Sequence, residues 1–295
     1  DTYEGSTNIR RGIQQSKNVL AVKTYTQNGS AIGLSYLDKF GFSTIQTVTD
    51  ANGRNDYGPT VALGGLTVGV TNLELTGAYA SIANEGIYQE PIFYTKIEDH
   101  DGNIVIDKTV DRETHQVISK ENAWLLTSAM QDVVNGGTGG AVKFNGMTIA
   151  GKTGTTSDDK DVWFVGYTPY YTAGVWAGYD IPTTKLKGTG EKNYHKKLWK
   201  SVMSRIHEDL ENKAFEKPED IIQVAVCSES GKLPVPGLCD MDQRGSCVVN
   251  EYFAKGFEPT ETCDVHIMAK VCHVTGQLAT DMCYWPLEQV RVILP

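Results

Sequence analysis

Apolar residues recur at the spacing of amphipathic helices in four stretches of the chain, and this periodicity is the first indication of its architecture. In the first stretch, residues 8–42, Ile9 and Ile13 share one face of a predicted helix. The Asn-Gly-Ser sequence at residues 28–30 interrupts the pattern and marks a new helix start, and Gly41 marks the end. The pattern therefore predicts consecutive short helices over this region.

Three later stretches are helical by the same criterion. Thr71 stands at an N-cap, with Glu74 at the capping-box position and Gly86 as the stop. A second capped helix is predicted from Ser119 to about Val134. The last one covers residues 192–210, and its inner face is expected to consist of Leu198, Val202, Ile206 and Leu210.

Alternation with a period of two marks the strands. A hairpin is predicted around Asp101-Gly102, a dipeptide that favours a tight turn. Three further strand-like runs are joined by short turns: Met147–Thr156, Asp161–Tyr167 and Thr172–Gly178. Short turns predict an antiparallel meander. Helices followed by antiparallel strands and a further helix indicate an α+β fold.

Composition and charge exclude several classes of function. The chain has 295 residues, of which 40% are hydrophobic, enough for one large core or two ordinary domains. Its formal charge of −9 argues against nucleic acid as a partner, because phosphate binding requires a basic face. No apolar run reaches the roughly eighteen residues that a membrane span requires. Because the chain begins in mid-pattern, we expect a fragment of a longer protein whose anchoring segment lies elsewhere.

All six cysteines lie in the C-terminal part, between Cys227 and Cys283. An even cluster in a loop-rich tail is typical of disulfides that form outside the reducing cytoplasm. This places the chain on the outer side of a membrane. We therefore expect two regions: residues 1–215, and a Cys-rich, disulfide-stapled extension over residues 216–295.

The tail contains a short internal repeat, C-x-x-Ser/Thr-G-x-L followed by a second cysteine, at residues 227–239 and 272–283. One disulfide within each copy would leave the two remaining cysteines to pair with each other. Six cysteines allow fifteen pairings. The expected pairs are Cys227–Cys239, Cys272–Cys283 and Cys247–Cys263.

The sequence Lys-Thr-Gly-Thr at residues 152–155 could carry chemistry at the edge of a strand. Lys152 would supply a fixed cation, and the hydroxyls of Thr153 and Thr155 could face a carboxylate. Gly154 would let an extended substrate lie against the strand and pair with its backbone. The amide of Thr155 would then be free to donate into an oxyanion hole. Taken alone, the tripeptide Lys-Thr-Gly is more typical of an ordinary edge strand with a solvated lysine.

The tripeptide Ser16-Lys17-Asn18 is a weaker signal. A serine followed two residues later by asparagine is most often a helix cap or a surface pair. The functional interpretation assigns Ser16 to proton transfer and the Asn18 amide to holding a substrate carbonyl. Together with Lys-Thr-Gly, however, the tripeptide matches two of the three motifs of penicillin-binding proteins and class A β-lactamases, S-x-x-K, S-x-N and K-T-G.

Whole phrases extend this match. "YEGSTNIRRGIQQSKNVLAVK", "ALGGLTVGVTNLELTGAYASIANEGIY", "VVNGGTGGAV" and "AGKTGTTSDDKDVWFVGYTPYYTAGVWAGYD" follow one another in the chain. Residues 1–215 resemble the transpeptidase domain of class A penicillin-binding proteins. The phrases "SGKLPVPGLC" and "TGQLATDMC" more loosely resemble the C-terminal extension of some family members from Gram-positive bacteria.

The resemblance implies a penicillin-binding protein or serine β-lactamase-like fold and a serine acyl-enzyme reaction. A serine would attack the D-Ala-D-Ala end of a peptidoglycan stem peptide, and an amine of a neighbouring strand would complete the cross-link. β-Lactam antibiotics would imitate the dipeptide. Ser16 and Asn18 match the second motif, and residues 152–155 match the third.

The first motif, which holds the nucleophile and its lysine, has no match at the expected place. Only fifteen residues precede Ser16, and we expect the motif upstream of residue 1, in a part of the protein missing here. The one literal S-x-x-K runs from Ser157 to Lys160. It lies in a predicted turn beside two carboxylates, which would raise the lysine pKa, so we interpret it as a turn. The chain alone is therefore expected to be inactive.

Three alternatives stay open. The parent protein could be a D,D-carboxypeptidase, because the motifs do not distinguish an amine acceptor from water. It could also be a non-catalytic scaffold of the cell-wall machinery. Finally, the tail cysteines with His266 and His273 could form a zinc module. Zinc sites prefer C-x₂₋₄-C pairs, and the gaps here are longer. No metal or other cofactor is therefore expected.

Overall fold

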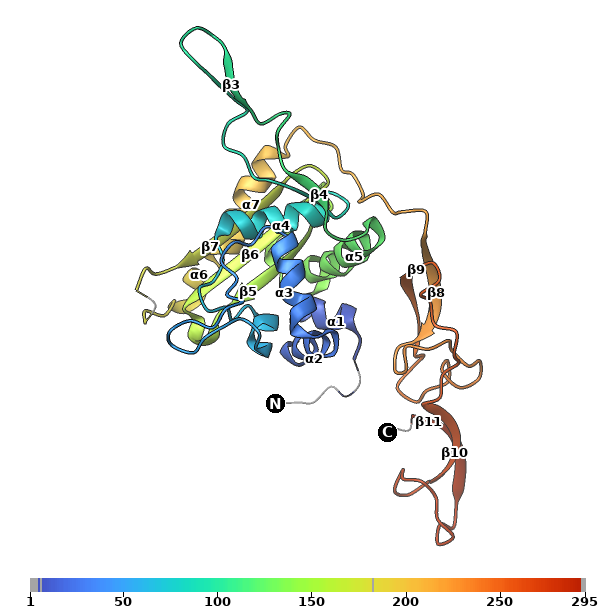
Figure 1. Cartoon of the computed structure of the whole chain (residues 1–295). Coiled ribbons are helices and arrows are strands. Elements are labelled where there is room, and N and C mark those ends of the chain that lie inside the picture. Colours follow the sequence, from blue (N-terminus) through green and yellow to red (C-terminus); the bar gives the residue numbers. More distant parts are fainter. Residues whose placement is uncertain (1–4, 6, 182, 293–295) are drawn as a thin grey trace. The chain divides into compact units, whose positions relative to one another are not determined.

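The computed structural model describes residues 5, 7–181 and 183–292. The described residues form two compact units, one over Ile9–Pro218 and one that comprises the chain from Glu219 onward together with the residues before Ile9 (Figure 1). Each unit is considered by itself below.

All helices of the described residues lie in the first unit, whose strands form three separate small sheets. Its helices are α1 (Ile9–Gln14), α2 (Asn18–Asn28), α3 (Ser30–Lys39), α4 (Asn72–Ala83), α5 (Lys120–Gly136), α6 (Gly188–Lys192) and α7 (Tyr194–Ile206), with 3₁₀ turns η1 (Pro59–Leu63), η2 (Gly140–Val142) and η3 (Ser157–Asp159). Its strands are β1 (Ile87–Gln89), β2 (Lys96–Glu98), β3 (Ile104–Asp107), β4 (Thr114–Gln116), β5 (Ala150–Thr155), β6 (Asp161–Tyr167) and β7 (Thr172–Gly178).

The central sheet of this unit has the order β5-β6-β7, and both pairs are antiparallel. The predicted meander is therefore confirmed, with β6 and β7 at the expected bounds and β5 shorter at both ends. The expected hairpin at Asp101-Gly102 is likewise present as the antiparallel pair β2–β3. Helices and antiparallel sheets in one unit confirm the α+β expectation.

Two clusters of buried side chains hold helices against opposite faces of the sheet. On one face, Ala150 and Tyr167 pack with Ile82 of α4 and Ala123 of α5. On the other, Phe164 packs with α7, and its ring lies edge-on to that of Trp199 at a centroid distance of 5.0 Å. Because successive side chains of a strand point to opposite faces, β6 can serve both clusters. The sheet thus lies between helical layers (Figure 1).

The expectation for the buried face of the last helix is wrong. Leu198, Val202 and Ile206 are 38%, 48% and 47% exposed, whereas the buried residues of α7 are His195, Trp199 and Met203. The helix is rotated by about one residue from the expectation, because the Trp199 ring packs on Phe164 and its Nε1 donates a hydrogen bond to the Ala173 carbonyl over 2.9 Å.

Local capping signals are confirmed in two helices. Thr71 and Glu74 form a reciprocal capping box at the start of α4, and the Ser119 side chain accepts from the Asn122 amide at the start of α5. Such caps satisfy backbone N–H groups that have no partner within the helix. They fix where the two central helices begin.

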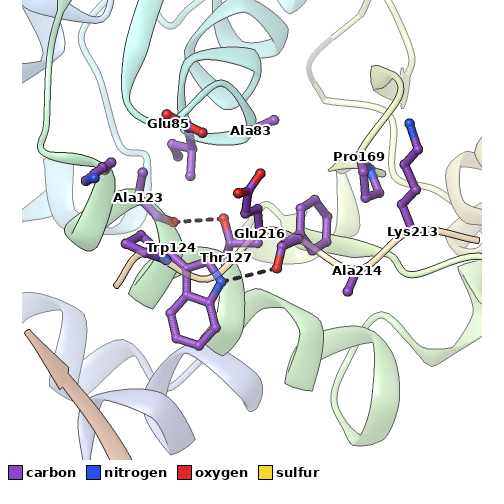
Figure 2. Close-up of a pocket in the computed structure, with 13 residues that line it drawn as sticks. Ala83, Glu85, Ala123, Trp124, Thr127, Pro169, Lys213, Ala214 and Glu216 are labelled. Atoms are coloured by element: carbon purple, nitrogen blue, oxygen red, sulfur yellow. Dashed lines mark hydrogen bonds between the residues drawn. The ribbon is translucent and has the colours of Figure 1, made fainter. Parts of the chain in front are cut away.

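The segment that follows α7 packs against the rest of the first unit. Residues 213–216 and Pro218 lie beside the N-terminal half of α5 and line a cavity of about 260 Å³ (Figure 2). The Phe215 carbonyl accepts a hydrogen bond from Trp124 Nε1 over 3.4 Å, and its ring lies 5.4 Å from that of Tyr167. The segment is therefore packed onto the first unit up to Pro218.

The second unit consists of two similar antiparallel hairpins. They pair β8 (Ile221–Cys227) with β9 (Val248–Ala254), and β10 (His266–Cys272) with β11 (Pro286–Val292). The first strand of each hairpin ends in a cysteine whose backbone makes the same two bonds. Cys227 pairs with Lys232 and Gly231, and Cys272 with Gln277 and Gly276, each over 2.8 Å. The sequence repeat is therefore a structural repeat.

All six cysteines are free thiols in this structure, so none of the three expected disulfides is present in it, and the pairings remain predictions. Among the described residues, no helix is both long enough and apolar enough to cross a membrane.

Candidate active site

Ser16 lies in the tight turn between α1 and α2. Its backbone adopts φ 55°, in the left-handed region, and its amide donates to the Ile13 carbonyl over 3.2 Å. The turn is fixed against α5 by the ion pair between Arg10 and Asp132, at 2.9 Å, and by a bond from Gln15 to the Gly136 carbonyl. The serine side chain is exposed, on a backbone that packing holds in place.

The strand β5, which carries Lys152 to Thr155, lies at the edge of the central sheet. At its end, the Thr156 amide donates to the Asp161 carbonyl of the β6 strand. Bonded and non-bonded pairs alternate along an antiparallel ladder. In this register, the amides and carbonyls of Thr153 and Thr155 point away from β6, to the open edge.

Lys152 and Ser16 are brought together by this arrangement. Lys152 Nζ donates to Ser16 Oγ over 2.7 Å and to the Thr153 carbonyl over 3.0 Å. Burial lowers the pKa of Lys152 to about 8, because removing an ammonium group from water disfavours its charged form. The site therefore places the amine of Lys152, which can gain or lose a proton near pH 8, beside the exposed hydroxyl of Ser16.

A second hydroxyl pair lies next to the first, between Thr153 Oγ1 and Thr138 Oγ1 at 2.7 Å. The turn that carries Thr138 approaches α1 closely, since a Cβ at Gly137 would lie 2.3 Å from the Gln14 carbonyl oxygen. Thr138 was not expected at the site. Its signal is the Gly-rich phrase at residues 136–140, whose glycines permit this close approach.

The remaining expected residues are placed as follows. Asn18 is the first residue of α2, with an exposed side chain two residues after Ser16. Gly154 pairs with Trp163, and a Cβ there would lie 3.2 Å from the Trp163 Cβ. Thr155 is exposed at the end of β5.

The literal S-x-x-K lies in the turn between β5 and β6, as expected. Ser157 opens the 3₁₀ turn η3, inside which Asp158 has φ 67°. The two acidic residues of the turn pair with other lysines, Asp158 with Lys185 at 3.0 Å and Asp159 with Lys192 at 2.6 Å. Ser157 is thus not on a helix that would present a lysine one turn later.

The cavity in Figure 2 is a separate feature from this site. Its lining includes Lys120, Trp124 and Thr127 from the first two turns of α5, whereas Ser16 is held near the other end of that helix. The candidate chemistry lies along the open edge of β5, and not in the cavity.

Comparison with known proteins agrees with this geometry. Residues 1–206 match the family described as the penicillin binding protein transpeptidase domain, and residues 217–268 match the C-terminal domain of penicillin-binding protein 1A. Penicillin-binding protein 1A of Clostridium botulinum is 36% identical over the whole chain, which covers 34% of that protein. Penicillin-binding protein 1F of Bacillus subtilis is 36% identical over 74% of this chain and 29% of its own length.

Solved structures show the same fold. Penicillin-binding protein 1A from Haemophilus influenzae superposes with a TM-score of 0.71 at 24% identity, over 90% of this chain and 42% of that one. The PonA1 protein from Mycobacterium tuberculosis in complex with penicillin V gives 0.60 at 24% identity, over 72% and 59%. The chain spans about a third of the length of the Clostridium botulinum protein. It belongs to the penicillin-binding protein transpeptidase family.

Proposed function

We propose that the protein to which this chain belongs is a peptidoglycan D,D-transpeptidase that cross-links the cell wall through a serine acyl-enzyme on the outer face of the cell membrane. The observation that carries the proposal is the bond from Lys152 to Ser16, made beside the open edge of β5. An open strand edge beside a cation suits one kind of ligand, an extended peptide that ends in a carboxylate.

Each group has a role in this proposal. A stem peptide, or a β-lactam in its place, adds to the edge of β5 and pairs with the outward amides and carbonyls of Thr153 and Thr155. The outward amide of Thr155 donates to the oxyanion that forms when the scissile carbonyl is attacked. The charged amine of Lys152 attracts the terminal carboxylate, and Asn18 holds the peptide carbonyl.

Ser16 transfers a proton in the same scheme. Its hydroxyl accepts from Lys152 at 2.7 Å and can donate to the departing amine while it regains a proton from the lysine. A lysine with a pKa of about 8 is suited to this exchange near neutral pH. Both groups are held by the fold and need no large rearrangement.

The attacking serine is supplied, in this proposal, by an S-x-x-K segment outside the 295 residues. The sequence contains one S-x-x-K, at residues 157–160, and that serine lies in a turn whose acidic residues pair with lysines elsewhere. Substrate-positioning groups without a nucleophile cannot form an acyl-enzyme.

The test is covalent labelling by a fluorescent penicillin, mapped by mass spectrometry. We expect no label on the 295-residue chain and a single label on the upstream serine in a protein that contains that segment. A β-lactam adduct on Ser157 would overturn the assignment. A stem-peptide donor incubated with an amine acceptor then distinguishes a transpeptidase, which forms the cross-linked product, from a carboxypeptidase, which releases D-Ala to water.

A further inference from the structure

Four potential metal ligands converge in the second unit. The thiols of Cys227, Cys239 and Cys263 and one ring nitrogen of His266 all lie within 4.8 Å of one another. All four residues are buried, with exposures between 0% and 7%. Polar groups that are buried this deeply need a partner, and the principal candidates here are one another or a bound cation.

The distances fit a tetrahedral zinc centre. With zinc bonds of about 2.3 Å to sulfur and about 2.0–2.1 Å to nitrogen, the sulfur-to-nitrogen edge of a tetrahedron is about 3.5 Å. His266 Nδ1 lies 3.5 Å from Cys227 Sγ and 3.4 Å from Cys263 Sγ. The imidazole therefore stands where a fourth zinc ligand would stand, with Nδ1 as its ligating atom.

The other nitrogen of this imidazole is held as in known zinc sites. His266 Nε2 lies 3.2 Å from Asp242 Oδ2, and Arg244 in turn binds Asp242 at 2.9 and 3.1 Å. A carboxylate that accepts from the distal N–H fixes the tautomer and orients the ring toward a metal. The guanidinium neutralises this carboxylate, so Asp242 supports the site and is not itself a ligand in the arrangement proposed below.

The backbone places each ligand independently of a metal. Cys227 ends β8, and His266 begins β10 three residues after Cys263. Two residues separate Cys263 from His266, as in the closest C-x₂₋₄-C ligand pairs of zinc sites. Cys239 Sγ accepts a bond from the Val235 amide over 3.2 Å, which fixes the position of its side chain. The site is thus prepared by three separate segments.

We propose that Cys227, Cys239, Cys263 and His266 bind a structural zinc ion in the C-terminal unit. Binding forms three Zn–S bonds and one Zn–N bond and releases three thiol protons, so the centre carries a net charge of −1. Four protein ligands leave no open position, which makes the ion structural and not catalytic. A unit built from two hairpins has a small core, and a metal is one of the usual ways to stabilise such a unit.

This assignment replaces two of the disulfides expected above, since Cys227, Cys239 and Cys263 cannot be oxidised and ligate zinc at once. Cys247 packs against the cluster without belonging to the four ligands. The side chains of Cys272 and Cys283 interact with each other in the second hairpin, and their disulfide is compatible with the zinc site.

The first test is the metal content of the complete chain, purified without chelator or reductant and measured by inductively coupled plasma mass spectrometry. We expect one zinc per chain, lost in Cys239→Ser and in His266→Ala. Cys272→Ser and His273→Ala are matched controls from the second hairpin and should keep the metal. Asp242→Asn keeps all four ligands and should lower zinc affinity by about 10–100-fold.

A second measurement uses the wild-type chain and therefore tests the proposal even if the variants fail to fold. The chelated and reduced wild-type chain is titrated with Co²⁺, and we expect the intense visible absorption of a tetrahedral thiolate site, displaced by zinc. The proposal is overturned if the isolated chain holds no zinc, peptide mapping links Cys227 to Cys239 by a disulfide, or the reduced chain gives no tetrahedral cobalt spectrum.

Discussion

Lys152 Nζ donates to Ser16 Oγ over 2.7 Å, and the two residues are 136 positions apart in the sequence. The bond joins the edge strand β5 to the turn between α1 and α2, so it depends on the packing of α1 against α5 and of α5 against the sheet. The site is therefore a property of the assembled unit, and each of its groups can be tested separately.

Replacement of Lys152 by methionine removes the cation while it keeps most of the side-chain volume. In a protein that also carries the S-x-x-K segment, we expect the second-order rate of acylation by a fluorescent penicillin to fall by about 100-fold or more, the size of effect typical of a lost charge-stabilising donor. Lys160→Met, in the neighbouring turn, is the matched control and should acylate at the wild-type rate. Equal losses in both variants would contradict the assignment.

The same acylation rate should depend on pH through Lys152. Its pKa is about 8, and only the charged form attracts the carboxylate of a ligand. The rate should therefore decrease as the pH rises through 8. In Lys152→Arg, whose guanidinium stays charged, this decrease should disappear even if the overall rate is lower. A wild-type rate that increases through pH 8 would show that the neutral amine is the active form.

Thr138 positions Thr153 through the hydroxyl pair at 2.7 Å. Thr138→Val keeps the shape and removes this bond, which contributes about 1 kcal/mol and so corresponds to about fivefold in acylation rate. Thr109→Val, in the turn that follows β3, removes an exposed hydroxyl bond far from the site in sequence and serves as the control. An unchanged melting temperature of both variants assigns the rate effect to the site, and an unchanged rate in Thr138→Val would remove Thr138 from it.

The bounds of the strands could be predicted from the sequence because turn residues mark their ends. Pro169 and the acidic turn at residues 157–160 delimit β6 on both sides, and period-two alternation needs no knowledge of the rest of the fold. The meeting of Ser16 with Lys152 could be expected from resemblance, but the part of Thr138 in it could not. Its role depends on a close approach between two backbones, and in the sequence this approach is indicated only by the neighbouring glycines.

Two expectations rest on local spacing alone, and the structure contradicts the one for α7. On α7, hydrophobicity alone favours burial of Leu198 over burial of His195. The face that carries Trp199 is buried instead, because the Trp199 ring packs against the ring of Phe164. In the tail, long gaps between cysteines argued against a metal site, but the hairpin of β8 with β9 and the start of β10 bring Cys227 next to His266. In both cases contacts between distant segments decided what local spacing left open.

The orientation of α7 can be tested with two neighbouring residues. Trp199 is 1% exposed and Leu198 38% exposed. Trp199→Ala should lower the free energy of unfolding by about 3–5 kcal/mol, because it leaves a cavity against Phe164. Leu198→Ala should lower it by about 1 kcal/mol or less. Urea denaturation followed by circular dichroism measures both, and a larger loss for Leu198→Ala would restore the orientation expected from the sequence.

His195 gives the first unit a stability that depends on pH. The residue is 2% exposed, and its Nδ1 is buried without a hydrogen-bond partner among the described residues. Burial, assisted by the charge of Lys196, lowers its pKa from 6.5 to about 4. Below pH 6.5 the unfolded chain therefore takes up a proton that the folded chain does not.

The free energy of unfolding should accordingly decrease as the pH falls from 6.5 to 4, with a contribution from His195 of up to about 1.4 kcal/mol per pH unit. In His195→Leu this contribution is absent, so the difference in stability between wild type and variant should change across that window and be constant above it. His100→Gln, in the exposed β2–β3 hairpin, is the control and should follow the wild-type profile. If the wild-type and His195→Leu profiles stay parallel from pH 7 to 4, then His195 is able to take up its proton within the folded unit, and its burial does not determine the acid stability of the protein.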